Sequence, residues 1–287
     1  MRQLDMVRAE KEMRHFQIPP SPAVLLEIHQ LAASGHSDAE DYAYSISKDV
    51  ALTGMLLKTI NSPVFGLKRK VLAVEQAIVL LGIARVEKLV TYIELRRAMS
   101  GKACISLEKF WDNSMDLASL MLMLPGYLKI KNTALQEDCF TVGLFRDCGI
   151  PLMAMRFDDY RQTLIEANSR PDVVFTDIEE NQYQTNHAVV GYFLASSWHL
   201  PDMICQLILR HHDIGLLAAG DVSDWAKDLY AMSKIAANIH SRIRYAEDSS
   251  EWLLDQDAVL THFQLSDMDY QELEQDLAEA FREKFGD

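Results

Sequence analysis

The sequence predicts an all-α protein. Apolar residues recur at helical spacing along most of the chain, and no stretch alternates apolar and polar residues over the length of a paired strand. Two short β-prone runs, residues 71–74 and 173–175, lie between helical segments, and neither has a hairpin partner. With 287 residues, 49% of them hydrophobic, the chain can bury a substantial core. We therefore expect a multi-helix bundle.

Prolines separate the first two expected helices. An amphipathic helix is expected over about residues 4–16, and a proline-rich stretch follows it. Ser21 and Pro22 then form an N-cap and N1 pair for a second helix, which runs to about Ala33. This arrangement predicts a helical segment of residues 1–17 ahead of the main domain.

Capping residues mark the next two helices. Ser37 and Glu40 have the spacing of a capping box, which starts a third helix, and Asp49 can cap a fourth over about residues 50–60. The fourth helix should stop at Asn61-Ser62-Pro63, because proline lacks a backbone donor and restricts the residue before it.

The remaining helices follow from apolar periodicity. The last one is capped by Ser266 and carries a stripe of Leu273, Leu277 and Phe281 opposite a strongly acidic face. The expected ranges are approximately residues 74–81, 84–99, 107–124, 135–155, 160–167, 185–198, 201–211, 223–240 and 267–285.

The charge of the chain is concentrated at its C-terminal end. The net charge is −14, and residues 247–287 hold 13 acidic side chains against Arg282 and Lys284. A protein that binds a phosphate backbone needs a basic stripe, so we expect no nucleic-acid partner. The acidic segment is interpreted as a solvated helix face, with a docking surface for a basic partner as the alternative.

Cysteine usage and hydropathy indicate the compartment. The four cysteines (Cys104, Cys139, Cys148 and Cys205) show no C-x-x-C spacing, which suits buried thiols in a reducing environment. No apolar run approaches the roughly 18 residues that a membrane span requires. We expect a cytoplasmic protein with no membrane partner.

The first third of the chain carries four distinctive sequence blocks, at residues 18–24, 47–53, 58–66 and 75–82. Together they resemble the HDOD family, the HD-related output domains of bacterial signalling proteins. The blocks occur in the expected order, and the resemblance covers about residues 18–213. It implies an all-helical fold, an HD-like core in the second half, and a signalling role usually taken to be non-enzymatic.

The second half carries an altered metal motif. Residues 144–149 resemble the L-x-H-D-x-G motif of HD-type metal-dependent phosphohydrolases, with Arg146 in place of histidine before Asp147. A guanidinium has no lone pair to donate to a metal and stays charged. Asn113 stands where the resemblance implies the first histidine, and Ser233 stands where it implies the late aspartate. One carboxylate does not hold a catalytic divalent ion, so we predict no catalytic residue, no metal and no cofactor.

The old metal site is expected to hold a polar cluster. Asp147 can accept hydrogen bonds from Asn113, Ser233 or Lys234, but it should not pair with Arg146, because adjacent residues on a helix point about 100° apart. A repurposed small-ligand pocket and a functioning metal site are the two alternatives.

Three histidines are possible neighbours of this site. His211 and His212 end the helix expected over residues 201–211, where an imidazolium favours the helix dipole, and adjacent residues on a helix diverge. Capping is therefore the leading interpretation, and a metal motif is the alternative. His187 matches a family position. We interpret it as a hydrogen-bonded core histidine, although it could face the same interior site as Asp147.

These observations favour a non-enzymatic regulatory module. The expected organisation is residues 1–17 as an N-terminal helix, 18–213 as the HDOD domain, and 214–287 as a helical extension that is acidic from residue 247. The module would act by binding a signalling protein or a small ligand, and it could form a homo-oligomer. A metal-dependent phosphohydrolase acting on nucleotides or phosphodiesters is the alternative.

Overall fold

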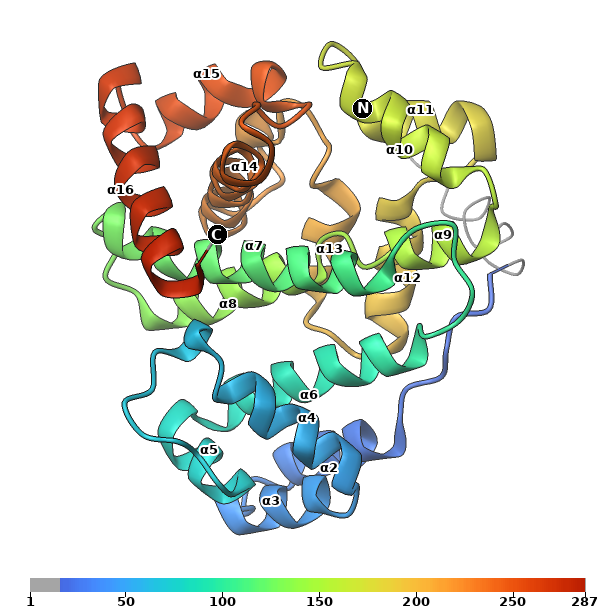
Figure 1. Ribbon diagram of the computed structural model, residues 1–287, viewed down its shortest axis with the longest axis vertical. Coiled ribbons are helices and arrows are strands. Elements are labelled where there is room, and N and C mark those ends of the chain that lie inside the picture. The colour runs from blue at the N-terminus through green and yellow to red at the C-terminus, as the bar shows by residue number, and fades with distance from the viewer. Residues whose placement is uncertain (1–15, 287) are drawn as a thin grey trace. The chain divides into compact units, whose positions relative to one another are not determined.

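A computed structural model describes residues 16–286, so the helix expected over residues 4–16 lies almost entirely outside the described residues. Within residues 16–286 every regular element is a helix, which confirms the all-α prediction (Figure 1). None of these helices is both long and apolar enough to cross a membrane.

Contacts along the chain define two compact units. Among the described residues, the N-terminal unit contains 19–100 together with 282–286, and the C-terminal unit contains 101–281 together with 16–18. The residues of the altered metal motif therefore lie within the C-terminal unit, and each unit is described separately below.

The N-terminal unit is built from short helices around one apolar core. Leu25, Ile28, Leu52, Leu56 and Ile60 are all fully buried in it. Its α-helices are α2 (Ala23–Ser34), α3 (Ala39–Ser47), α4 (Val50–Ile60), α5 (Val74–Leu81) and α6 (Ile83–Ala98), and a 3-10 turn, η1, covers Pro63–Phe65.

Two predicted helix starts were wrong by one residue. Pro22, not Ser21, is the N-cap of α2. The capping box of α3 is formed by Asp38 and Asp41, whose carboxylates each accept a hydrogen bond from the other residue's backbone N–H. The hydroxyl of Ser37 instead donates to the carbonyl oxygen of Leu31, and the carboxylate of Asp38 accepts from the backbone N–H groups of the first turn of α3.

Asn61 fixes the turn after α4, which ends where the sequence predicts. Its amide nitrogen donates to the carbonyls of Leu57 (2.7 Å) and Val71 (2.8 Å), and its amide oxygen accepts from the backbone N–H of Val71 (2.7 Å). One side chain thus closes the loop between α4 and α5.

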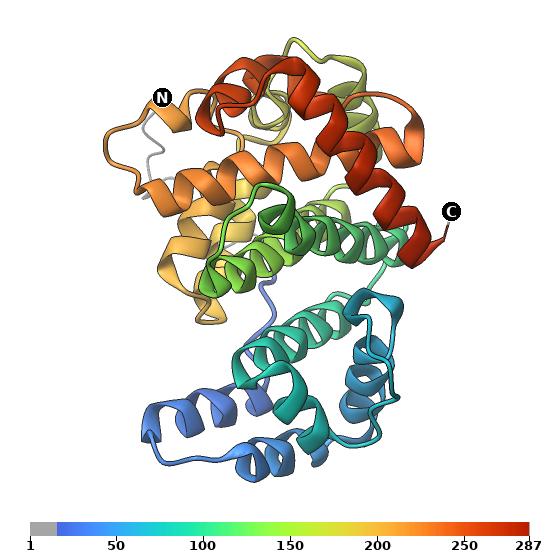
Figure 2. The same cartoon turned by 90° about the vertical axis from the view of Figure 1, so that its left-hand side faces the viewer.

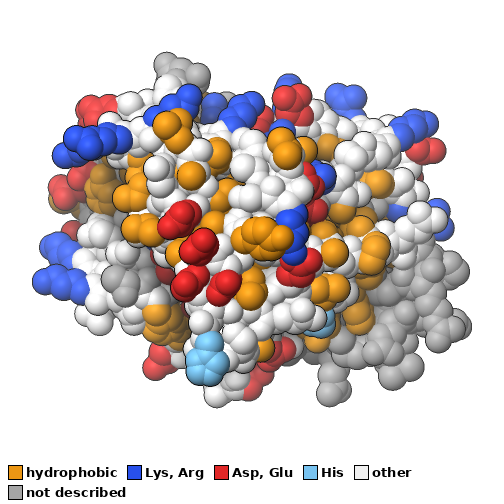
Figure 3. Space-filling view, turned by 90° about the horizontal axis from the view of Figure 1, so that it is seen from below, with side chains coloured by type: hydrophobic (Ala, Val, Ile, Leu, Met, Phe, Trp, Pro, Cys, Tyr) orange, Lys and Arg blue, Asp and Glu red, His pale blue; other side chains and the backbone are white. Residues whose placement is uncertain are grey.

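Several large apolar side chains of the N-terminal unit are exposed. Apolar side chains lie among charged ones on the face seen in Figure 3. The most exposed are Val50, Val79, Leu72 and Tyr44, each at least 70% accessible. These residues belong to the surface of the unit and not to its core.

The C-terminal unit is centred on three long helices. The antiparallel pair α7 (Leu107–Tyr127) and α8 (Thr133–Phe145) packs against α14 (Asp224–Tyr245), which crosses both (Figure 2). The other helices are α9 (Ile150–Arg156), α10 (Tyr160–Ser169), α11 (Phe175–Tyr183), α12 (His187–Ser197), α13 (Asp202–Arg210), α15 (Trp252–His262) and α16 (Asp267–Phe285), with a 3-10 turn, η2, at Leu216–Ala218.

The helix predicted over residues 135–155 was wrong, because the chain breaks between α8 and α9. Gly149 is the N-cap of α9, and Pro151 occupies the first turn, where proline's fixed φ favours a new helix start. The break lies at residues 146–149, so Arg146 and Asp147 sit at a helix junction.

Gly149 brings this junction against α12. A Cβ atom at position 149 would lie 2.0 Å from the carbonyl oxygen of His187 and 2.7 Å from the backbone nitrogen of Gly191. Only a residue without a side chain allows the two backbones to approach this closely. The approach places Asp147 beside the start of α12.

Candidate functional site

The Arg-Asp pair of the altered motif forms an ion pair. The Nε of Arg146 donates to Oδ2 of Asp147 at 2.9 Å, and its Nη1 donates to the carbonyl oxygen of Ser233 at 3.2 Å. The expectation that these neighbours would not pair was wrong, because α8 ends at Phe145 and Arg146 is its C-cap. Outside a regular helix, adjacent side chains are free to converge.

The other oxygen of Asp147 faces three histidines. Oδ1 lies 3.1 Å from Nε2 of His211 and 3.7 Å from Nε2 of His187. The Nε2 atom of His187 in turn lies 3.3 Å from that of His211 and 3.0 Å from that of His212. These four ligand atoms all lie within 4.8 Å of one another, and we call the four residues the histidine–aspartate cluster.

Each member of the cluster sits at a helix end. His187 is the first residue of α12, whose N-cap Asn186 accepts from the backbone N–H of Val189. His211 is the C-cap of α13, and His212 follows it. We expected His211 and His212 to diverge, but the helix stops at Arg210 and their rings lie 4.0 Å apart between centroids. Helix ends thus gather side chains that a continuous helix would have separated.

Acceptor groups hold the far side of every imidazole. The Nδ1 atom of His187 lies 2.7 Å from Oε2 of Glu179, and that of His212 lies 2.7 Å from a carboxylate oxygen of Glu251. The Nδ1 atom of His211 lies 2.7 Å from the backbone carbonyl oxygen of Ile208. Ionised carboxylates and carbonyls only accept hydrogen bonds, so each Nδ1 carries the hydrogen.

The electrostatic environment shifts the pKa values of the four cluster members in different directions. Although burial opposes ionisation, Arg146 and the histidines hold the pKa of Asp147 well below its usual value. Burial lowers the pKa of His211 and lowers that of His212 further still. Burial acts in the same direction on His187, but the carboxylates of Glu179 and Asp147 outweigh it and raise its pKa to about 9.

Lys234 belongs to a neighbouring ionic network and not to the partners of Asp147. Its Nζ lies 3.1 Å from both Oε2 of Glu251 and Oδ2 of Asp255, and all three side chains are buried. The same Glu251 holds His212 and accepts from the backbone N–H of Phe175 at 2.8 Å. Part of the acidic C-terminal segment is therefore internal, not a solvated face.

The metal set implied by the HD resemblance does not fit the residues present. Arg146 replaces a ligand with a cation that binds Asp147, and the hydroxyl of Ser233 donates to the carbonyl of Tyr230. Asn113 is half-buried on α7. The expected polar cluster of Asp147 with Asn113, Ser233 or Lys234 was wrong in its partners, because Asp147 instead meets Arg146, His187 and His211.

Glu179 and Glu251 are the site residues that the sequence did not reveal. Glu179 is fully buried on α11, where it also accepts from the hydroxyl of Tyr160, and Glu251 is the N-cap of α15. Neither helix was predicted. Nothing in the local pattern distinguishes these glutamates from exposed ones in acidic surroundings.

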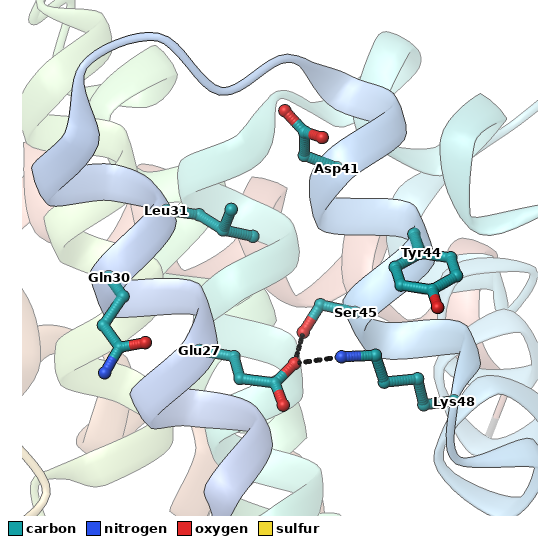
Figure 4. Close-up of a pocket in the computed structure, with 7 residues that line it drawn as sticks. All are labelled: Glu27, Gln30, Leu31, Asp41, Tyr44, Ser45 and Lys48. Atoms are coloured by element: carbon teal, nitrogen blue, oxygen red, sulfur yellow. Dashed lines mark hydrogen bonds and ion pairs between the residues drawn. The ribbon is translucent and has the colours of Figure 1, made fainter.

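Two other features are weaker candidates for a functional site. An open pocket between α2 and α3 is lined by Glu27, whose carboxylate already accepts from Ser45 (2.6 Å) and Lys48 (2.7 Å) (Figure 4). Near the cluster, burial raises the pKa of the Cys148 thiol, so the thiol stays protonated and is a poor nucleophile.

Comparisons with known proteins agree with this architecture. A family model, the HDOD domain, matches residues 18–214. A protein of Treponema pallidum (strain Nichols) without a described function is 25% identical over 198 residues, which cover 69% of this chain and 38% of the relative. The chain thus matches well under half the length of that relative.

Solved structures share the fold. An HDOD domain protein of unknown function from Geobacter sulfurreducens superposes with a TM-score of 0.70 at 21% identity, covering 98% of both chains. A protein from Shewanella amazonensis SB2B, named as a candidate phosphohydrolase, gives a TM-score of 0.66 at 20% identity, covering 98% of this chain and 94% of the other. At these identities the likeness establishes the fold alone.

Proposed function

The chain belongs to the HDOD domain family, and from that premise we propose that it is a non-enzymatic, cytoplasmic signal-transduction module that acts by binding a protein partner. The family assignment supports a signalling role. The choice between binding and hydrolysis depends on the site in the C-terminal unit.

The pairing of Arg146 with Asp147 carries the proposal. Phosphoester hydrolysis by the HD motif needs a metal that activates water, and a dinuclear site needs carboxylate oxygens free to bridge two ions. Here one oxygen of Asp147 is held by a guanidinium at 2.9 Å. The fixed positive charge of Arg146 opposes a metal ion beside that oxygen. Only the other oxygen of Asp147 faces the histidines.

Burial of the site supports the same conclusion. The side chain of His187 is fully buried, that of His211 is 3% exposed, and those of His212 and Asp147 are 11% and 22% exposed. A phosphodiester substrate would need to reach the reacting centre. Side chains this deeply buried favour a structural or regulatory role over turnover.

The test is phosphoester hydrolysis by the full-length protein. We expect no turnover of bis-p-nitrophenyl phosphate or of nucleotides above the buffer rate in the presence of Mn²⁺. The Asp147→Asn variant should behave identically. Turnover by the wild-type chain that is lost in Asp147→Asn would establish the phosphohydrolase alternative.

A basic protein surface is the partner chemistry that we propose. Glu272, Asp276 and Glu279 lie on one face of α16 at spacings of four and three residues, and all three are exposed. Long-range attraction to such a face is screened by salt.

Charge-neutral variants test this face. In a pull-down at low salt, the triple variant Glu272→Gln, Asp276→Asn, Glu279→Gln should retain little of the basic protein partner that the wild-type chain binds. High salt should release the partner from the wild-type chain as well. A matched triple variant, Glu75→Gln, Glu108→Gln, Asp172→Asn, removes as many exposed charges elsewhere and should retain capture. Equal capture by both variants would return α16 to the interpretation of a solvated surface. A truncation before residue 247 is unsuitable, because it removes Glu251 from the buried network.

A further inference from the structure

We propose that the histidine–aspartate cluster binds one divalent transition-metal ion of the zinc class. The four ligand atoms are Oδ1 of Asp147 and the Nε2 atoms of His187, His211 and His212. Ligands placed about 2.1 Å from a tetrahedral zinc ion lie roughly 3.4 Å from one another. The separations in the cluster include 3.0, 3.1, 3.3 and 3.7 Å, which bracket that value.

The three imidazole rings are not only close together but also oriented as metal ligands are. Because each Nδ1 donates its hydrogen to Glu179, Ile208 or Glu251, the Nε2 atoms of all three imidazoles point into the cluster, and each can offer a lone pair there once a metal ion displaces its proton. The Nε2 atoms of His187 and His212 lie 3.0 Å apart, a separation that needs either a proton or a metal ion between them. Metal-ligating histidines almost always donate their other N–H to a carboxylate or carbonyl, as all three do here.

The ligand set identifies the class of ion. Three imidazoles and one carboxylate suit zinc or a neighbouring transition metal, whereas calcium and magnesium take oxygen ligands. Arg146 restricts Asp147 to a single oxygen, so the protein supplies four ligands. Four protein ligands fill a tetrahedral sphere, which is typical of structural sites and leaves no position for a reactive water.

The inferred site differs from the one that the HD resemblance implies. Of the positions implied by that motif only Asp147 takes part, whereas the three histidines come from the start of α12 and the end of α13. The ion would join the α8–α9 junction to α12 and α13. Its role is to hold these helix ends together, independently of whether the module binds a partner.

Cobalt is the probe that tests this site. Full-length protein stripped with chelator and titrated with Co²⁺ should bind one ion per chain, with the visible absorption of tetrahedral Co²⁺, and Zn²⁺ should displace it. His187→Ala and His212→Gln should each remove the absorption and weaken binding by at least 100-fold. His36→Ala, which changes an exposed histidine of the N-terminal unit, should bind cobalt like the wild type.

A second measurement separates loss of the site from loss of the fold. Zn²⁺ should raise the Tm of the stripped wild-type protein by about 5 °C or more, because an ion that binds only the folded state stabilises it. A folded His212→Gln variant, checked by circular dichroism, should show no such rise. Absence of Co²⁺ absorption and of a Tm rise in the wild-type protein would overturn the proposal, as would unchanged binding in both histidine variants. A proton would then be the cation within the cluster.

Discussion

Gly149→Ala is expected to destabilise the C-terminal unit by about 3 kcal/mol or more, because the new methyl group would overlap the backbone of α12. Its Cβ would lie 2.0 Å from the carbonyl oxygen of His187 and 2.7 Å from the nitrogen of Gly191, and neither atom belongs to a flexible side chain. Relief would require α12 to move away from the α8–α9 junction. Urea denaturation followed by circular dichroism measures the change in the free energy of unfolding.

Gly126→Ala is the matched control for this variant. Gly126 lies within α7, and a Cβ there would meet no atom within 4 Å. Alanine should therefore stabilise the protein by roughly 0.5–1 kcal/mol, since it restricts the unfolded chain without straining the helix. Equal stabilities of the two variants would contradict the close approach of α12 to the junction.

Glu251→Gln is expected to have the largest effect on the proposed metal site without changing a ligand. Its carboxylate accepts from His212, Lys234 and the backbone of Phe175, and these partners hold its pKa far below the usual value despite burial. An amide weakens the acceptor for His212 and leaves the buried ammonium of Lys234 with one carboxylate instead of two. We expect a 10- to 100-fold loss of Co²⁺ affinity and about 3 kcal/mol of lost stability.

Glu247→Gln makes the same chemical change at an exposed position four residues earlier, and it should alter neither quantity. Measuring both variants by Co²⁺ titration and urea denaturation separates the local role of Glu251 from a general effect of charge. Cobalt affinity that is unchanged in a folded Glu251→Gln protein would show that Glu251 does not orient His212.

The sequence predicted the fold well because helix starts and apolar stripes are local signals. The bounds of α5 and α16 agree with the expected residues 74–81 and 267–285. Two helices, α11 and α15, were missed because their sequences are short and acidic. The prediction of one continuous helix over residues 135–155 was wrong because it followed the apolar periodicity and gave too little weight to Gly149 and Pro151, where the chain starts a new helix.

The site was less predictable because it depends on helix ends brought together in space. The sequence identified every member of the cluster as a site position or a possible neighbour, but reasoning from a regular helix separated Arg146 from Asp147 and His211 from His212. Both pairs converge because α8 and α13 stop just before them. Glu179 and Glu251, which orient two of the histidines, come from the helices that sequence patterns did not reveal.

The central claim is that Arg146 has replaced the HD-type metal site while an adjacent cluster binds one ion. Anomalous X-ray diffraction at the zinc edge, from crystals of zinc-loaded full-length protein, tests it most directly. The account predicts a single strong peak bonded to Oδ1 of Asp147 and to Nε2 of His187, His211 and His212. A peak bonded to Asn113 or Ser233, or a second ion in place of the Arg146–Asp147 ion pair, would contradict it.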